Sequence, residues 1–401
     1  MRAVVTRREI LKVAGGAMVL VATKSAYAAD ATGVTDDKIK IGILGDLTGH
    51  AAHWGSGNLA GGTLAFEEIN AAGGINGRKL EWISVDSESS APKGIAGFKR
   101  LVDQEKVFAI FGPTSSAVGV PLLKTMASSG VPIFVPTFSS PLITNPPVKN
   151  IFRSGTLNDA DQGRIIADYV ASISKKRSIA LMRQSDEYGK NGATNVGNRL
   201  KEIGNVKISE EQFNASDTDF TSQLLRIRES DADVMVVYGY PAPSAIVMRQ
   251  AKQLGLPVQI VGSTATASRT YAATVGKEAA GTRSMTTTKY LPEGDDAEIV
   301  KFRKAFEARF PELARQTRPE ATDQLAYHGA KTLIEGLKRA GRDLTREKLI
   351  SSLEGLKDFE TGIASATTFG PDRREGNRSG YVLEIKDDLS RIVLPKAYSA
   401  I

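Results

Sequence analysis

The chain contains no cysteine in 401 residues. Disulfides, thiolate metal sites and cysteine nucleophiles are therefore excluded. Histidine is also scarce, because the whole sequence has three. His50 and His53 have a His-x-x-His spacing, but His328 is the only other histidine, so no third ligand for a metal is in view. We expect neither a metal site nor a bound cofactor.

Sequence motifs of common enzyme classes are missing as well. Neither a Gly-x-Ser-x-Gly elbow nor a Walker loop occurs. The glycines of Gly55–Gly61 are similar to those of a dinucleotide loop, and Asp86 ends a predicted strand. Their spacing is off by one, however, and the segment begins about eleven residues after the first strand, too far for a phosphate turn. Catalysis would have to rest on carboxylates alone, and no pair of them stands out.

The first 28 residues are typical of an export signal. Thr6–Lys12 resembles the twin-arginine consensus, Val13–Ala22 is apolar, and Ala26–Ala28 has the small-x-small cleavage pattern. The apolar run is about ten residues long, whereas a membrane span needs about 20, which disfavours an N-terminal anchor. We expect cleavage near Ala29 and a periplasmic protein.

Two residues bear on which export pathway, twin-arginine or Sec, recognises this signal. Ile10 stands where the twin-arginine consensus usually has Phe, but Lys24 near the cleavage site favours that pathway over Sec. No later stretch approaches 18 apolar residues, so the mature chain should be soluble.

The net charge argues against nucleic-acid binding, and the length of the chain predicts the number of domains. The formal charge is +7, and the leader holds +4 of it, which leaves +3 for the rest of the chain. Basic and acidic residues are interspersed there, and this argues against a nucleic-acid surface. About 370 residues remain after cleavage, which predicts two domains.

Short β-rich apolar runs alternate with helical patterns in the first half of the chain. This order is typical of βαβ units on a parallel sheet. The predicted strands are Lys40–Leu44, Leu80–Asp86, Phe108–Phe111 and Pro132–Val135, and the predicted helices are Leu59–Ala71, Pro92–Gln104 and Val118–Ser128.

The same rhythm restarts after the proline-rich residues 136–147, and a third part follows from about Ala297. The second half has predicted strands at Ser178–Met182, Val206–Ser209, Asp233–Tyr238 and Val258–Gly262, with helices at Asp159–Ser174, Gly192–Ile203, Phe220–Ser230 and Pro243–Leu254. The third part has predicted helices at Ala297–Arg309 and Asp323–Ala340, a short helix, and strands at Tyr381–Ile385 and Arg391–Leu394.

Several local strings resemble the branched-chain amino-acid-binding proteins that serve ABC importers. The strings follow one another over about 330 residues in the order that the family has. They are Ile39–Gly49, Ala52–Gly55, Ala65–Asn70, Gly73–Gly77, Gly112–Ser116, Tyr188–Gly189, Asp233–Tyr240 and Met248–Gly255.

The resemblance implies an α/β fold with two Rossmann-like lobes. Each lobe would have a parallel central sheet flanked by helices, and a three-crossover hinge would join the lobes beside a ligand cleft. Lobe 1 would comprise residues 30–156 and 288–368, and lobe 2 residues 157–287 and 369–401.

A candidate anion site follows from the chain itself. Gly112–Ser116 follows a predicted strand and opens a helix, so backbone N–H groups and the hydroxyls of Ser115 and Ser116 would face an anion. The bland alternative is that one of these serines only caps the helix.

The resemblance adds the other walls of this site. It implies that Ser116 and Ser139 contribute hydroxyls, that Thr137 contributes backbone groups, and that Trp54 covers the ligand. Phe138 would suit a flat apolar ligand. From lobe 2, Tyr188 and Tyr240 would meet the ligand on closure, although tyrosines in such loops can also be packing residues.

Thr264 departs from the family pattern. Relatives that bind amino acids have an acidic residue there, which pairs with the ligand ammonium. Burying an ammonium without a carboxylate is costly. Either Asp186 or Asp323 substitutes, or the ligand lacks an amine and is an aromatic or aliphatic carboxylate.

We therefore expect a monomeric, non-enzymatic solute-binding protein that captures an amino acid or related small carboxylate and delivers it to an ABC transporter permease. The alternatives are a ligand-sensing subunit for a signalling receptor and an exported α/β enzyme. The absence of a DNA-binding headpiece or later membrane segment disfavours a one-protein regulator.

Overall fold

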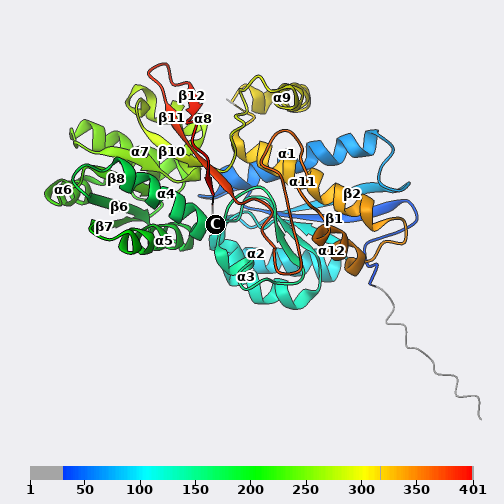
Figure 1. Cartoon of the computed structure of the whole chain (residues 1–401). Coiled ribbons are helices and arrows are strands. Elements are labelled where there is room, and N and C mark those ends of the chain that lie inside the picture. The colour runs from blue at the N-terminus through cyan, green and yellow to red at the C-terminus, as the bar shows by residue number, and fades with distance from the viewer. Residues whose placement is uncertain (1–29, 317, 400–401) are drawn as a thin grey trace, which may run out of the picture.

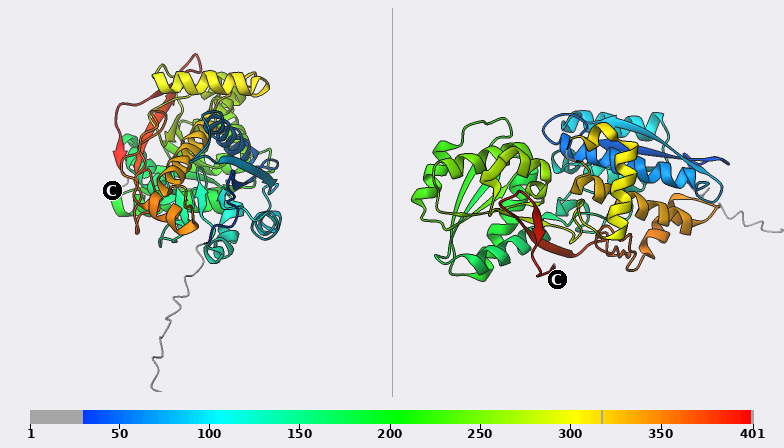
Figure 2. Two further views of the ribbon diagram at one scale, coloured as in Figure 1. Left: turned by 90° about the vertical axis from the view of Figure 1, so that its right-hand side faces the viewer. Right: turned by 90° about the horizontal axis from the view of Figure 1, so that it is seen from above.

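The computed structural model describes residues 30–399 apart from residue 317. Two α/β lobes lie side by side and meet at a central region through which the chain passes repeatedly (Figures 1 and 2). The predicted signal peptide falls outside the described residues. Within them, no helix combines the length and the apolar character needed to cross a membrane.

The first lobe is built on a five-stranded sheet with the order β2-β1-β3-β4-β5, in which all neighbours are parallel. Its strands are β1 (Lys38–Gly45), β2 (Lys79–Asp86), β3 (Ala109–Phe111), β4 (Ile133–Val135) and β5 (Ile151–Arg153). In β1, Ile39, Ile41 and Ile43 join the core on one face, whereas Leu44 joins the core on the other. Side-chain alternation along a strand produces this division.

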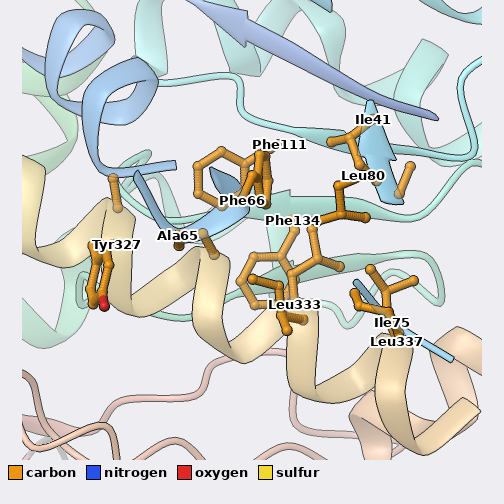
Figure 3. Close-up of a cluster of buried hydrophobic side chains, with 14 of the residues drawn as sticks. Ile41, Ala65, Phe66, Ile75, Leu80, Phe111, Phe134, Tyr327, Leu333 and Leu337 are labelled. Carbon is orange, nitrogen blue, oxygen red and sulfur yellow. The ribbon is translucent and has the colours of Figure 1, made fainter. Parts of the chain in front are cut away.

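Helices cover both faces of this sheet. One face carries α1 (Ala52–Ala71), α9 (Ala297–Arg309), α11 (Ala321–Ala340) and α12 (Arg346–Glu354), and the other carries α2 (Ala91–Lys99) and α3 (Ser116–Ser129). Figure 3 shows Phe66 of α1 and Leu333 of α11 in the same cluster as Phe111 and Phe134 of the sheet. Segments far apart in sequence thus complete one core.

The second lobe has an eight-stranded sheet. Its main path is β12-β11-β10-β9-β8-β6-β7, and β13 pairs with β11. Strands β6 to β10 run parallel, whereas β11 is antiparallel to β10, β12 and β13. The strands are β6 (Ser178–Gln184), β7 (Lys207–Phe213), β8 (Val234–Tyr238), β9 (Gln259–Gly262), β10 (Arg283–Thr286), β11 (Ser379–Ile385), β12 (Arg391–Val393) and β13 (Tyr398–Ser399).

Helices again pack on both faces. They are α4 (Asp159–Ile173) and α5 (Glu187–Ile203) on one side, and α6 (Thr221–Glu229), α7 (Pro241–Gln253) and α8 (Arg269–Val275) on the other. The short α10 (Pro311–Ala314) follows α9. The chain goes from the first lobe to the second after β5, returns after β10, and crosses a third time before β11.

The predicted fold class is confirmed: two mostly parallel sheets are each flanked by helices. The residue boundaries of the lobes stay a prediction. Phe369 does pack against Phe134 and Phe152 of the first sheet, so the third passage leaves that core after this ring.

Element bounds differ from the predictions at a few places. Helix α1 begins at Ala52, earlier than the predicted Leu59, because its glycines lie within a helix and not in a loop. The predicted helix Pro92–Gln104 is α2 followed by a π-helical turn at Arg100–Gln104. Strands β5 and β10 and helix α8 were not predicted.

Candidate functional site

All nine predicted site residues line one cavity between the lobes. Thr114, which was not predicted, completes the lining. The lobe 1 residues come from the loops after β3 and β4 and from α1, and the lobe 2 residues come from the N-terminal ends of α5 and α7 and the segment after β9. The predicted members are Trp54, Ser115, Ser116, Thr137, Phe138, Ser139, Tyr188, Tyr240 and Thr264.

The cavity is nearly shut. Its free volume is about 10 Å³, which is enough for about one water molecule. Nine of the ten lining residues are buried, and Thr264 is half-buried. A solute can enter this site only when the lobes move apart.

The lobe 1 wall is the beginning of α3. Ser115 is the N-cap residue, and its Oγ accepts a hydrogen bond of 3.4 Å from the backbone N–H of Val118. The Ser115 hydroxyl therefore caps the helix, which is the structural role predicted as the alternative for these serines. Ser116 is the first helical residue, and its buried Oγ has no hydrogen-bond partner among the described residues. An anion at the N-terminus of α3 would supply that partner.

The lobe 2 wall is a pair of tyrosines. The rings of Tyr188 and Tyr240 stack at 5.0 Å with an interplanar angle of 21°. The Tyr188 hydroxyl donates to Ser263 Oγ at 2.9 Å. The Tyr240 hydroxyl is buried and has no hydrogen-bond partner within the described part of the chain. Each lobe thus brings one unsatisfied hydroxyl to the same cavity.

Among the described residues, no charged side chain lines the cavity. Thr264 lies in it, and its Oγ1 donates to Gln162 Oε1 at 3.1 Å. Asp186 is outside the lining, where it caps α5 through Gly189 and accepts a bond from Gln184. Asp323, on the first turn of α11, is also outside the lining, and it forms an ion pair with Arg318. Neither acid proposed as a substitute faces the cavity.

Two other acids lie directly behind the lining. Asp159 is buried, and its Oδ1 accepts a hydrogen bond of 3.0 Å from the Tyr238 hydroxyl. Burial raises the pKa of Asp159 to about 7, although the hydroxyls of Ser139 and Tyr238 oppose the shift. Its Oδ2 has no partner among the described residues. Sequence reasoning missed this residue, which was predicted only as the first residue of a helix.

Asp46 occupies the corresponding place behind the lobe 1 wall. It accepts hydrogen bonds from Ser87 and Thr114 at 3.0 and 2.6 Å. Burial raises the pKa of Asp46, although these hydroxyls oppose the shift. The Asp46–Thr114 bond joins the end of β1 to the loop before α3, so it fixes the backbone from which Ser116 projects.

A second small space adjoins the cavity, and both are lined by Trp54 and Thr264. Its free volume is about 20 Å³. Its other walls are mostly hydroxyl-bearing or small side chains, and include Thr156, Thr286, Thr287, Thr288 and Thr322.

The remaining motifs have structural explanations. A Cβ on Gly55 would lie 2.1 Å from Asp46 O, and one on Gly61 would lie 2.2 Å from Asp323 O. These glycines let α1 approach β1 and α11 closely.

No group of three metal-ligating side chains occurs among the described residues. His50 faces Asp186, and burial lowers the pKa of His53.

Comparison with known proteins gives the family. The periplasmic binding protein family model matches residues 38–389, so the chain belongs to this family. The Leu/Ile/Val-binding protein homolog 3 of Brucella melitensis is 26% identical over 332 residues, which are 82% of this chain and 86% of the relative. A leucine-, isoleucine-, valine-, threonine- and alanine-binding protein of Pseudomonas aeruginosa is 27% identical over 327 residues, which cover 81% and 84%.

A solved structure agrees. The branched-chain amino acid transporter substrate-binding protein LivJ of Streptococcus pneumoniae, in complex with isoleucine, matches with a TM-score of 0.77 and 26% identity, covering 89% of this chain and 99% of LivJ. The resemblance to Leu/Ile/Val-binding proteins is therefore confirmed. These relatives are binding proteins and not enzymes, and the family is periplasmic.

Proposed function

We propose that this protein captures a small organic carboxylate in the cleft between its lobes and presents the closed complex to an ABC transporter permease. The supporting observation is the pair of buried, unpartnered hydroxyls of Ser116 and Tyr240 on opposite walls of one cavity. A buried polar group without a partner costs about 1–3 kcal/mol. A ligand that bonds to both hydroxyls would remove this cost and hold the lobes together.

The carboxylate end of the ligand belongs at α3. The N-terminus of this helix carries partial positive charge, and Ser116 adds a hydroxyl donor. The apolar surfaces of Trp54 and of the stacked Tyr188 and Tyr240 suit a flat or branched body.

The uncharged lining favours an acid without an α-ammonium group. An amino acid would have to bury its ammonium beside Thr264, which carries no charge. One observation favours an amino acid instead: Asp159 has a free buried oxygen close behind Ser139. Its raised pKa means that this acid is partly protonated near neutral pH, so we place the des-amino acid first.

Delivery to a permease rather than sensing rests on the family and on relatives whose names describe transporter components. The twin-arginine export route stays a prediction for residues 1–28, which lie outside the described chain.

A thermal-shift screen of the mature protein tests the proposal. The panel holds branched and aromatic amino acids beside their des-amino and 2-oxo acids. A ligand at a hundred times its dissociation constant adds about 2.7 kcal/mol of stability. At least one carboxylate should raise the melting temperature in a saturable way. A panel without any such ligand would contradict the proposed ligand class.

A further inference from the structure

A large polar cavity lies away from the ligand cleft, at the crossings between the lobes. Its free volume is about 410 Å³, far larger than that of the cleft cavity. Its walls come from three segments: the loop after β4, the start of α4, and the third chain crossing. The lining residues that matter here are Thr144, Asn158, Asp161, Arg373, Arg374, Glu375 and Arg378.

Two of the charged groups in this wall are already satisfied. Glu375 accepts bonds from Arg153, Thr144 and Asn158. Arg374 donates to the carbonyls of Val148 and Gly370 and forms an ion pair with Glu354 at 2.6 Å. Each of these two groups is therefore already paired with a group of opposite charge.

The other two guanidinium groups form no ion pair with a described residue. Arg373 donates to the backbone carbonyls of Glu375 and Gly376, and the nearby charges of Asp358 and Glu375 only partly oppose the lowering of its pKa. Arg378 is half-buried and makes no hydrogen bond or ion pair with any described residue. Their like charges repel each other, and burial together with Arg378 lowers the pKa of Arg373. Two guanidiniums without an ion-pair partner among the described residues, beside one cavity, favour a doubly charged anion.

We propose that this hinge cavity, defined by Arg373 and Arg378, is a second ligand site, specific for a small doubly charged anion. The anion would accept bonds from both guanidiniums and relieve their repulsion. Because the walls belong to both lobes and to the third crossing, a bound anion would favour the lobe arrangement seen here. The site shares no lining residue with the ligand cleft.

Asp161 controls the charge balance of this cavity. Burial, and secondly the nearby Glu375, raise the pKa of Asp161 to about 6. The exposed Asp372 is the remaining acid in the wall, and Arg153 lies behind Glu375. Ionised Asp161 repels an anion, whereas protonated Asp161 does not. Anion binding should therefore tighten as the pH falls through about 6.

Titration calorimetry with sulfate, without any cleft ligand, tests the site directly. Sulfate keeps its double charge over this pH range, so a change in affinity reports on the protein. We expect saturable millimolar binding that tightens from about pH 8 to about pH 5 as Asp161 is neutralised. Arg378→Gln and Arg373→Gln should each weaken it at least tenfold, and Asp161→Asn should tighten it at high pH and remove most of the pH dependence.

Arg339→Gln is the matched control, because Arg339 is an exposed arginine paired with Glu335 on the surface of α11. Melting curves establish that each variant is folded. If an arginine variant does not fold, Asp161→Asn still tests the charge argument. The absence of saturable sulfate binding to the unmodified protein, or equal affinity in Arg378→Gln and Arg339→Gln, would overturn the proposal. Neither result bears on ligand capture in the cleft.

Discussion

His50 and Asp186 face each other across the cleft, with 3.8 Å between His50 Nε2 and Asp186 Oδ2. His50 precedes α1 of the first lobe, and Asp186 caps α5 of the second. The His50 ring also lies 5.4 Å from the ring of Tyr240. A second contact between the lobes joins α8 to the start of α11, where the backbone N–H of Arg269 donates to Glu320 at 3.0 Å. These contacts can exist only when the lobes are together.

Replacement of His50 should weaken closure without touching the ligand. His50→Gln removes the contact with Asp186, and since a partly exposed contact of this kind contributes at most about 1 kcal/mol, we expect ligand affinity to fall about two- to fivefold. Lys38→Gln is the control, because Lys38 forms an exposed pair with Glu81 inside the first lobe. Calorimetry that finds equal affinities for the two variants would exclude a latch at His50.

Ser116→Ala should remove one hydrogen bond to the ligand carboxylate. Such charge-assisted bonds contribute about 1.5–3 kcal/mol, so binding should weaken about ten- to a hundredfold. Ser128→Ala provides a control on the same helix, because Ser128 is exposed and its hydroxyl bonds to Thr125. Calorimetry decides. Unchanged affinity in folded Ser116→Ala protein would show that the carboxylate lies elsewhere.

The ligand class depends on Thr264. A des-amino acid should bind at least about tenfold more tightly than the amino acid of the same shape, a difference of about 1.4 kcal/mol. Competition between leucine or phenylalanine and the corresponding des-amino acid measures this ratio. Thr264→Glu should shift it towards the amino acid.

A clear preference of the unmodified protein for the amino acid would contradict this ranking. Asp159→Asn then identifies the acid that serves the ammonium, because it should remove the preference if Asp159 is that group.

Asp159 also predicts a pH dependence of stability. The pKa of its carboxyl group is raised to about 7 by burial, from an ordinary value of 3.8. Between these two values the folded protein retains a proton that the unfolded chain has lost, so the contribution of this group to stability falls as the pH rises and is constant above about 7.

Asp159→Asn should therefore gain stability relative to the unmodified protein between about pH 4 and pH 7, up to a few kcal/mol. The asparagine oxygen can still accept the bond from Tyr238. Urea unfolding across this range provides the measurement, with Asp231→Asn as an exposed control. A difference that does not change with pH would show that Asp159 is ionised in the fold.

The sequence predicted much of this molecule because two signals are local. Short β-rich apolar runs define the parallel strands, and the helix-opening string Gly112–Ser116 places Ser116 shortly after β3, at the first residue of α3. The resemblance to the family supplied Trp54, Tyr188 and Tyr240, which come from three separate segments. All nine predicted residues do meet at one cavity, but their role as ligand contacts stays a prediction.

Other features depend on tertiary contacts that no local pattern contains. Strand β10 has one apolar residue, Met285, among Arg283–Thr286 and is recognisable only from its neighbours β9 and β11. The early start of α1 was not predicted, because the glycines in its first turns indicated a loop. In the structure these glycines allow close contact with α11. Asp159 is significant because Tyr238, which is 79 residues away, bonds to it.

Capture by a closing cleft is the central claim, and X-ray solution scattering tests it most directly. The cavity seen here has a free volume of about 10 Å³ and is lined from both lobes, by Trp54, Tyr188 and Tyr240 among others, so the free protein must spend time in a more open form for a ligand to enter. We predict that a saturating carboxylate ligand reduces the radius of gyration measurably. Identical scattering curves with and without saturating ligand would contradict the account.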